Sequence, residues 1–362
     1  TVMAAPFDPD AMELSDAAVP LVEGVQSFKL SPSGSLAYFP GLTGQGANTE
    51  LMWVTRAGDA TPVDEGWRFD RGGGNVGWSL SPDGTRIAVR HRGQGGTNDI
   101  WIKEIPGGPF RRLTFGEEER VPFWTPDGAR VTYFSRHALE GGDVWWVRAD
   151  GTGQPELLLE ASPGFAQGTW SPDGRSLVLR TGGISTTGGY RPGTRDLAVF
   201  RPGVEQAATL LVATAEYSEQ DPRVSPDGRW LAYVSNETGR DEVFVRPFPE
   251  VDAAKVQVSV GGGFGPLWSS AGRELFYVDL ASNMVAVRFD ASAEFRVTAR
   301  DVLFAIPTGY VRGVGNSSID IAPDGQRFLM GRSLRGPVSE GEAPRMVLVQ
   351  NFSEELRRRV PR

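Results

Sequence analysis

Few residue types in this sequence can act as nucleophiles or metal ligands. There is no cysteine, and the only histidines are His91 and His137. An α/β-type serine hydrolase needs a Gly-x-Ser-x-Gly elbow, and Gly77-Trp78-Ser79-Leu80-Ser81 comes nearest but lacks the second glycine. Two histidines without a carboxylate at fixed spacing indicate exposed loop residues rather than a metal site. The sequence therefore predicts no catalytic residue, no metal site and no cofactor.

A series of aspartates recurs in one four-residue pattern. The seven copies are Ser31-Pro32-Ser33-Gly34, Ser81-Pro82-Asp83-Gly84, Thr125-Pro126-Asp127-Gly128, Ser171-Pro172-Asp173-Gly174, Ser225-Pro226-Asp227-Gly228, Ser269-Ser270-Ala271-Gly272 and Ala322-Pro323-Asp324-Gly325. Proline presets the first turn position, aspartate caps the turn, and glycine takes the left-handed conformation. The aspartates are therefore expected to cap hairpin turns and not to form a ring of catalytic acids.

The spacing of these turns predicts the architecture. Their second positions are 32, 82, 126, 172, 226, 270 and 323, which gives steps of 50, 44, 46, 54, 44 and 53 residues. Blades of a β-propeller repeat at this period. Large apolar residues such as Trp124, Trp170 and Trp268 precede the turns, and we expect them in the core between blades. The prediction is an all-β, seven-bladed β-propeller of four-stranded antiparallel blades, with six or eight blades as alternatives.

We expect one domain over residues 1–362, with blades beginning near 25, 76, 120, 166, 221, 264 and 317. Residues 1–24 are similar to the late strands of a blade, and residues 318–330 to the early ones. Joining both in one closing sheet would hide two exposed strand edges. Residues 345–350 also look like a third strand, so two segments compete for that place.

Composition and charge exclude several classes of function. The net charge of −8 and the pI of about 5.1 disfavour nucleic-acid binding, which needs a basic surface. Apolar runs stay below the roughly 20 residues of a membrane helix, so we expect no membrane insertion of this segment. The absence of cysteine suits an oxidising envelope compartment. The first residues already read as a strand, and we expect a piece of a longer protein.

The turn followed by a strand such as Asp99-Ile100-Trp101 resembles the TolB-like Pro-Asp propeller repeats over nearly the whole chain. Four stretches, 239–249, 261–268, 323–330 and 348–356, resemble the C-terminal propeller region of bacterial membrane-anchored serine/threonine kinases. This resemblance implies an extracytoplasmic location (periplasm or cell envelope) and tethering through a membrane helix outside this chain. It brings no catalytic residue, because the kinase loops are absent from the sequence.

We therefore expect a non-catalytic binding or sensor domain for a protein, peptide or small-molecule ligand. The alternatives are a stand-alone periplasmic TolB-like scaffold and a propeller-type hydrolase with a site in the channel. Loops that join successive blades converge at the channel mouth, where a rigid frame can present binding residues. The candidate binding residues are Arg68, Asn75, Arg120, Tyr217, Gln220, Arg223, Tyr310, Arg312 and Asn316.

Overall fold

The structure is a computed structural model that forms two compact units. It describes residues 2–4, 7–8, 13–14, 19–22, 25–31, 33–40, 48–71, 77–93, 96–116, 118–138, 141–160, 164–182, 195–311, 319–334, 347–350, 352, 354 and 356. The smaller unit contains Thr1–Gly46 and Arg335–Arg362, and the larger unit contains Ala47–Leu334. The sequence analysis treated all of these residues as one domain. Among the described residues, no helix has the length and apolar character needed to cross a membrane.

The hairpin turns form through the contacts that their sequence predicts. Ser81 Oγ donates to Asp83 Oδ1 at 2.5 Å, and the Thr85 N–H donates to the same oxygen at 3.1 Å. Gly84, with φ of 72°, donates its N–H to the Ser81 carbonyl at 2.8 Å. The same side-chain contacts recur at Asp127, Asp173 and Asp227. The predicted turn-capping role of these aspartates is confirmed.

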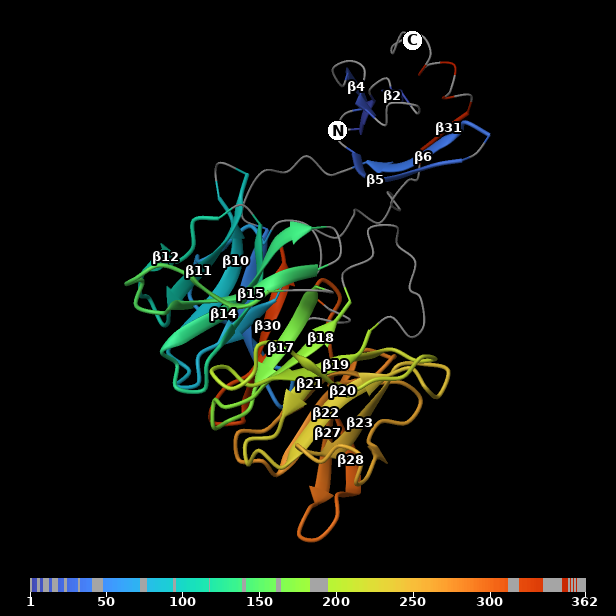
Figure 1. The fold of residues 1–362 in the computed structure, drawn as a ribbon. Helices are drawn as coiled ribbons and strands as arrows, with labels where there is room; N and C mark the ends of the chain where they lie inside the picture. Colours follow the sequence, from blue (N-terminus) through green and yellow to red (C-terminus); the bar gives the residue numbers. More distant parts are fainter. Residues whose placement is uncertain are drawn as a thin grey trace. The chain divides into compact units, whose positions relative to one another are not determined.

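The larger unit folds into six four-stranded antiparallel sheets within its described residues (Figure 1). A single residue pair, Gly142 with Phe165, joins the second and third sheets. We number the sheets as blades in chain order. The first contains β9 (Trp78–Leu80), β10 (Arg86–Arg92), β11 (Asn98–Glu104) and β12 (Phe110–Arg112), and the second β13 (Glu119–Trp124), β14 (Arg130–Ala138), β15 (Gly141–Arg148) and β16 (Glu156–Leu159). The third contains β17 (Phe165–Trp170), β18 (Leu177–Thr181), β19 (Leu197–Phe200) and β20 (Thr209–Val212), and the fourth β21 (Glu219–Val224), β22 (Trp230–Ser235), β23 (Glu242–Pro247) and β24 (Val256–Gln257). The fifth contains β25 (Phe264–Trp268), β26 (Glu274–Val278), β27 (Asn283–Asp290) and β28 (Arg296–Ala305), and the sixth β29 (Ile319–Ile321), β30 (Arg327–Ser333), β7 (Thr49–Thr55) and β8 (Ala60–Pro62).

Six clusters of buried apolar side chains each join one pair of neighbouring blades. Trp124 packs with the first blade, Trp170 with the second and Trp268 with the fourth, which confirms their predicted place in the core between blades. One cluster joins the sixth blade to the first, through Leu329 and Ile87. Each fully buried large apolar side chain stabilises the fold by about 1.5–3 kcal/mol. Contacts between blades therefore close a six-membered ring.

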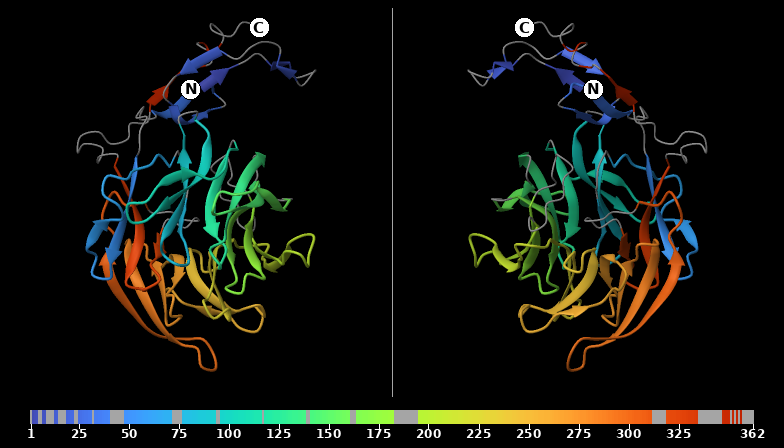
Figure 2. Two further views of the ribbon diagram at one scale, coloured as in Figure 1. Left: turned by 90° about the vertical axis from the view of Figure 1, so that its left-hand side faces the viewer. Right: turned by 90° about the vertical axis from the view of Figure 1, so that its right-hand side faces the viewer.

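The sheet that closes the ring contains strands other than those that were predicted. β30 pairs with β7 over seven residue pairs, from Arg327 with Thr55 to Ser333 with Thr49, and Figure 2 shows these blue and red-orange strands side by side. The predicted partner, residues 1–24, lies in the smaller unit. β7 fits the place because Leu51, Met52 and Val54 are all buried, which supplies apolar surface to both neighbouring blades.

The smaller unit holds the remaining predicted blade. It contains β1 (Val2–Ala4), β2 (Phe7–Asp8), β3 (Glu13–Leu14), β4 (Val19–Val22), β5 (Val25–Leu30), β6 (Leu36–Pro40) and β31 (Val347–Val349). β31, β6 and β5 form a three-stranded sheet, β1 pairs with β4, and β2 pairs with β3. The turn at residues 31–34 therefore belongs to this unit, and the predicted count of seven blades in one ring is not confirmed. The third-strand place of the closing sheet, for which residues 2–7 and 345–350 were predicted to compete, is filled by β7 instead, and β31 pairs with β6 in the smaller unit.

Candidate functional site

The first strands of the six blades surround a channel. Neighbours contact each other in the order β9, β13, β17, β21, β25 and β29, and β29 contacts β9 again. At this last junction the Leu80 N–H donates to Asp320 Oδ2 at 2.8 Å. A cavity of about 320 Å³ lies between the six strands and is lined mainly by apolar and proline side chains. Cavities of this size hold small ligands, so the channel is the candidate site.

The channel wall is built from the inner edges of the blades, because each first strand pairs along its length with one strand only, apart from the single pair of Phe165 with Gly142. Its free backbone groups therefore need other partners. The Trp124 indole N–H donates to the Ser79 carbonyl at 2.9 Å, and the Trp268 indole N–H donates to the Arg223 carbonyl at 2.9 Å. Prolines at Pro122, Pro222 and Pro266 remove N–H donors from the same edge. Tryptophan side chains of the next blade thus donate hydrogen bonds to some of the free backbone carbonyls in the channel wall.

Three of the prolines follow residues with left-handed backbone. Val121, Asp221 and Gly265 have φ of 50°, 53° and 63°, and each lies at a register shift in its strand pair. A positive φ is strained for valine and aspartate, and such strain persists only where packing enforces it. Gln167 holds the side chain of Asp221, because Gln167 Nε2 donates to Asp221 Oδ1 at 2.6 Å. These bulges fix the backbone at the end of the channel that lies away from the hairpin turns.

One residue from each first strand, two positions before the hairpin turn, lines the cavity. In blade order these residues are Ser79, Phe123, Thr169, Arg223, Leu267 and Asp320, and we call them the lumen ring. Phe123 and Leu267 are buried and come from the second and fifth blades, which are opposite in a ring of six. Asp320 and Ser79 come from adjacent blades on one side, and Thr169 and Arg223 from adjacent blades on the other. The lumen ring is therefore polarised across the channel.

Burial raises the pKa of Asp320, while the hydrogen bond from the Leu80 N–H and the positive charge of Arg223 act in the opposite direction. The backbone N–H of Ile321 also donates to Asp320, at 2.9 Å. Within the described residues, no group of three or more histidine, aspartate or glutamate side chains is placed to hold a metal ion. The channel lining thus contains two carboxylates, Asp320 and Asp221, and one guanidinium, Arg223, between apolar walls.

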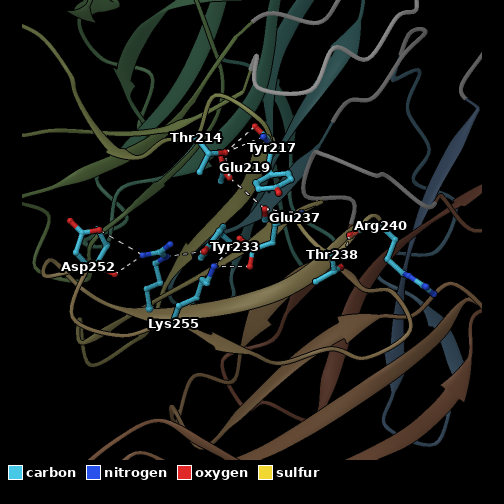
Figure 3. A network of polar contacts seen from close by, with 12 residues as sticks. Thr214, Tyr217, Glu219, Tyr233, Glu237, Thr238, Arg240, Asp252 and Lys255 are labelled. Atoms are coloured by element: carbon cyan, nitrogen blue, oxygen red, sulfur yellow. Dashed lines mark hydrogen bonds and ion pairs between the residues drawn. The ribbon is translucent and has the colours of Figure 1, made fainter.

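Buried carboxyl groups lie between blades at the starts of two first strands. Glu119 lies within hydrogen-bond reach of Asp99, and burial together with the charge of Asp99 raises the pKa of Glu119 to about 7. Burial likewise raises the pKa of Glu219 to about 7, in the network of Figure 3, where Thr214 Oγ1 donates to Glu219 Oε1 at 3.2 Å. Asp196 contributes a further negative charge beside Glu219. Each group sits in a junction between blades.

The structure brings one of the nine predicted binding residues, Arg223, into the cavity lining. Gln220 is buried and accepts a hydrogen bond from Arg195 at 2.7 Å. Tyr217 donates its backbone N–H to Thr214 at 3.1 Å (Figure 3). The remaining described candidates lie outside the cavity lining: Arg68 is exposed, and Arg120 and Tyr310 are half-buried. Asn75, Arg312 and Asn316 lie outside the described residues. A binding role for these eight residues stays a prediction.

The sequence analysis named one member of the lumen ring, Arg223, and missed the other five. The signal is present in the sequence, since alignment of the turns places Asp320 and Arg223 at the same offset, one position before the large apolar residue. The histidine prediction is also partly wrong. His91 lies half-buried on β10, with its ring 5.0 Å from that of Trp101, and burial lowers the pKa of His91. The side chain of His137 lies outside the described residues.

No protein-family model matches the sequence. The chain is 27% identical over 197 residues to the uncharacterized peptidase YuxL of Bacillus subtilis, which covers 45% of this chain and 29% of YuxL. The structure of a TolB-like protein from Agrobacterium tumefaciens superposes with a TM-score of 0.59 at 20% identity, over 80% of this chain and 99% of that one. A puromycin hydrolase superposes with a TM-score of 0.52 at 16% identity, over 80% of this chain and 47% of that one.

These findings correct the predicted function. The expectation of a non-catalytic sensor region of a serine/threonine kinase is wrong, because the relative with a named activity is a peptidase and a hydrolase shares the fold. One of the stretches that carried the kinase resemblance, 239–249, forms a hairpin turn and β23, which are ordinary parts of a blade. Residues of this kind indicate the fold and do not indicate the activity of the protein to which the chain belongs. The chain has the fold of the TolB-like β-propellers.

Proposed function

We propose that this chain is the β-propeller part of a peptidase-type hydrolase and that its channel binds the peptide-like substrate. The observation that carries the proposal is the channel cavity, whose walls combine apolar side chains with a few polar groups. Short peptides have the same mixed character, and their burial in such a cavity is favourable when the polar groups find partners. The partial match to YuxL, along less than a third of its length, supports a peptidase context.

The test uses tryptophan fluorescence, because Trp78, Trp124, Trp170 and Trp268 all line the cavity. Short apolar tripeptides should change the emission in a saturable manner. Thr169→Phe narrows the lumen and should abolish the response. Thr209→Phe is the matched control, because Thr209 is exposed on β20, the outer strand of the same blade. Absence of saturable binding in the unmodified chain would refute a peptide-binding channel.

The hydrolase context has its own test. The full-length product of the gene should hydrolyse aminoacyl p-nitroanilides, and Thr169→Phe in that product should lower kcat/KM while Thr209→Phe leaves it unchanged. Equal kcat/KM values for Thr169→Phe and Thr209→Phe would show that the channel takes no part in the reaction.

An extracytoplasmic location is part of the proposal. The sequence has no cysteine, which suits an oxidising compartment. Recovery of the native protein in the periplasmic or envelope fraction of its host is the expected result, and recovery in the cytosolic fraction would contradict it.

A further inference from the structure

The channel cavity departs from sixfold symmetry at the junction between the fifth and sixth blades. Its described lining residues come from the first strands, the residue before β9 and the hairpin turns, apart from Val278 and Ile306. Val278 ends β26, the second strand of the fifth blade, and Ile306 directly follows β28. The cavity therefore extends from the lumen into the space between these two blades.

Six residues that line the cavity also belong to the apolar cluster of this junction. We call them the side pocket: Phe264, Leu267, Val278, Ile306, Ile319 and Ile321. Four of them are at most 9% exposed, and Phe264 and Ile321 are half-buried. None of the six has a charged or hydrogen-bonding side chain, so the side pocket presents an apolar surface to a ligand.

A bulge in β25 brings two of these residues to one side of the strand. Phe264 pairs with Val278 and Leu267 pairs with Phe276, so one extra residue lies between the two pairs. Residues three apart face opposite sides in a regular strand, and the extra residue of a bulge brings them to the same side. Gly265, with φ of 63°, allows this bend, and a Cβ there would meet no heavy atom within 4 Å. The bulge therefore lies beside open space.

Side-chain size accounts for the place of the side pocket in the ring. Val278 is six positions after the glycine of its hairpin turn, and three other blades have larger side chains at that position: Arg90, Phe134 and Arg180. In the sixth blade the position is Gly331, where the ring of Trp78 takes the space. The fourth blade also has a valine, Val234, which shares an apolar cluster with Phe264. The small side chain of Val278 leaves room at the junction of the fifth and sixth blades.

We infer that the side pocket binds one large apolar side chain of a ligand that lies in the channel. The inference rests on the proposed function and names its substrate class, which is peptides with a leucine-like or phenylalanine-like residue. Burial of such a side chain removes apolar surface from water and favours binding. A lysine or glutamate side chain would lose its hydration and find no opposite charge among the six residues. The side pocket is thus the part of the channel that determines specificity.

The test measures the binding of tripeptides Ala-X-Ala by calorimetry, with both ends capped and with glycine, leucine, phenylalanine or lysine as X. The leucine and phenylalanine peptides should bind about ten to a hundred times more tightly than the glycine peptide. The lysine peptide should bind no more tightly than the glycine peptide. Val278→Phe introduces the ring that the second blade has at this position, and it should remove the preference for leucine while the glycine peptide still binds. Ile306→Ala enlarges the side pocket and should raise the affinity for phenylalanine relative to leucine.

Val302→Phe is the matched control, because Val302 is exposed on β28 of the same blade and does not line the cavity. This variant should keep the full preference for leucine over glycine. Equal affinity for the glycine, leucine and phenylalanine peptides, with binding still lost in Thr169→Phe, would overturn the side-pocket inference and leave the peptide-binding channel intact. No binding of any peptide to the unmodified chain would overturn both.

The variants also decide whether these residues are the ones that recognise the ligand. An unchanged preference for leucine in Val278→Phe, with folding confirmed by circular dichroism, would overturn the assignment to the side pocket. If Val278→Phe does not fold, Ile306→Ala provides the answer, because an unchanged ratio of phenylalanine to leucine affinity in that variant would overturn the assignment equally.

Discussion

Replacement of Glu119 by glutamine perturbs the carboxyl pair between the first and second blades. Glu119 is 5% exposed, and its neighbour Asp99 is ion-paired to Arg112 at 2.7 Å. Burial and the charge of Asp99 raise the pKa of Glu119 from 4.5 to about 7. The folded protein therefore binds this proton more tightly than the unfolded chain does.

The direction and size of the effect follow from proton linkage. Because the pKa is higher in the folded state, the stabilising contribution is complete below pH 4.5 and is lost as the pH rises through about 7. A difference of about 2.5 pKa units, at about 1.4 kcal/mol per unit, gives about 3–4 kcal/mol of unfolding free energy. Glutamine cannot ionise, and its amide can donate to Asp99 as the protonated carboxyl does. Between pH 5 and pH 9 the unmodified protein should lose about 3 kcal/mol more than Glu119→Gln.

The assay is denaturant unfolding followed by tryptophan fluorescence at pH 5, 7 and 9. All ten tryptophans lie between residues 53 and 268, so the signal reports the larger unit alone. Glu65→Gln is the control, because Glu65 is exposed, and it should follow the pH dependence of the unmodified protein. A free-energy difference between Glu119→Gln and the unmodified protein that stays constant from pH 5 to pH 9 would refute the buried carboxyl pair.

Three further substitutions test a close contact, a strained backbone position and an ion pair in the larger unit. Gly331→Ala should destabilise the larger unit by about 2 kcal/mol, because a Cβ there would overlap the ring of Trp78. Ser282→Gly should stabilise it by about 1 kcal/mol, because Ser282 has φ of 66°. Arg56→Ala should cost about 1 kcal/mol at low salt and less at 1 M salt, because Arg56 makes two hydrogen bonds of 2.8 Å to Glu274 across the fifth and sixth blades. Denaturant midpoints measure all three.

Each of these substitutions has a control in the same chain. Gly93→Ala adds a Cβ where no heavy atom lies within 4 Å, and it should be neutral. Ser292 does not have a positive φ, so Ser292→Gly should destabilise the larger unit or leave its stability unchanged. Arg288→Ala removes an exposed pair with Asp301 and should cost less than Arg56→Ala. Equal effects in a variant and its control would contradict the packing argument at that position.

The carboxyl pairs were invisible to sequence analysis for a physical reason. Asp99 and Glu119 are 20 residues apart and belong to different blades. Their interaction depends on how adjacent blades pack, since only burial turns two ordinary acids into one proton-sharing site. The same holds for the lumen ring, because its six residues line one cavity only when the first strands of all six blades pack together.

The sequence by itself determined the hairpin turns and hence the blades. Each turn is closed by contacts within five residues, such as those of Ser81 with Asp83 and Arg86, so its formation needs no distant partner. Six of the predicted blade starts, near 76, 120, 166, 221, 264 and 317, lie within two residues of an observed first strand. The TolB-like fold followed from the same repeat.

Only the tertiary structure decided which strands close the ring. Residues 2–8, 49–55 and 345–350 all have the pattern of a third strand, so local sequence cannot choose among them. The choice falls on β7 because seven residue pairs with β30 and the burial of its apolar residues between two blades outweigh the cost of closing a long loop. Strand pairing and the placement of charges across the channel are decided by contacts between distant residues, and these exist only once the ring has formed.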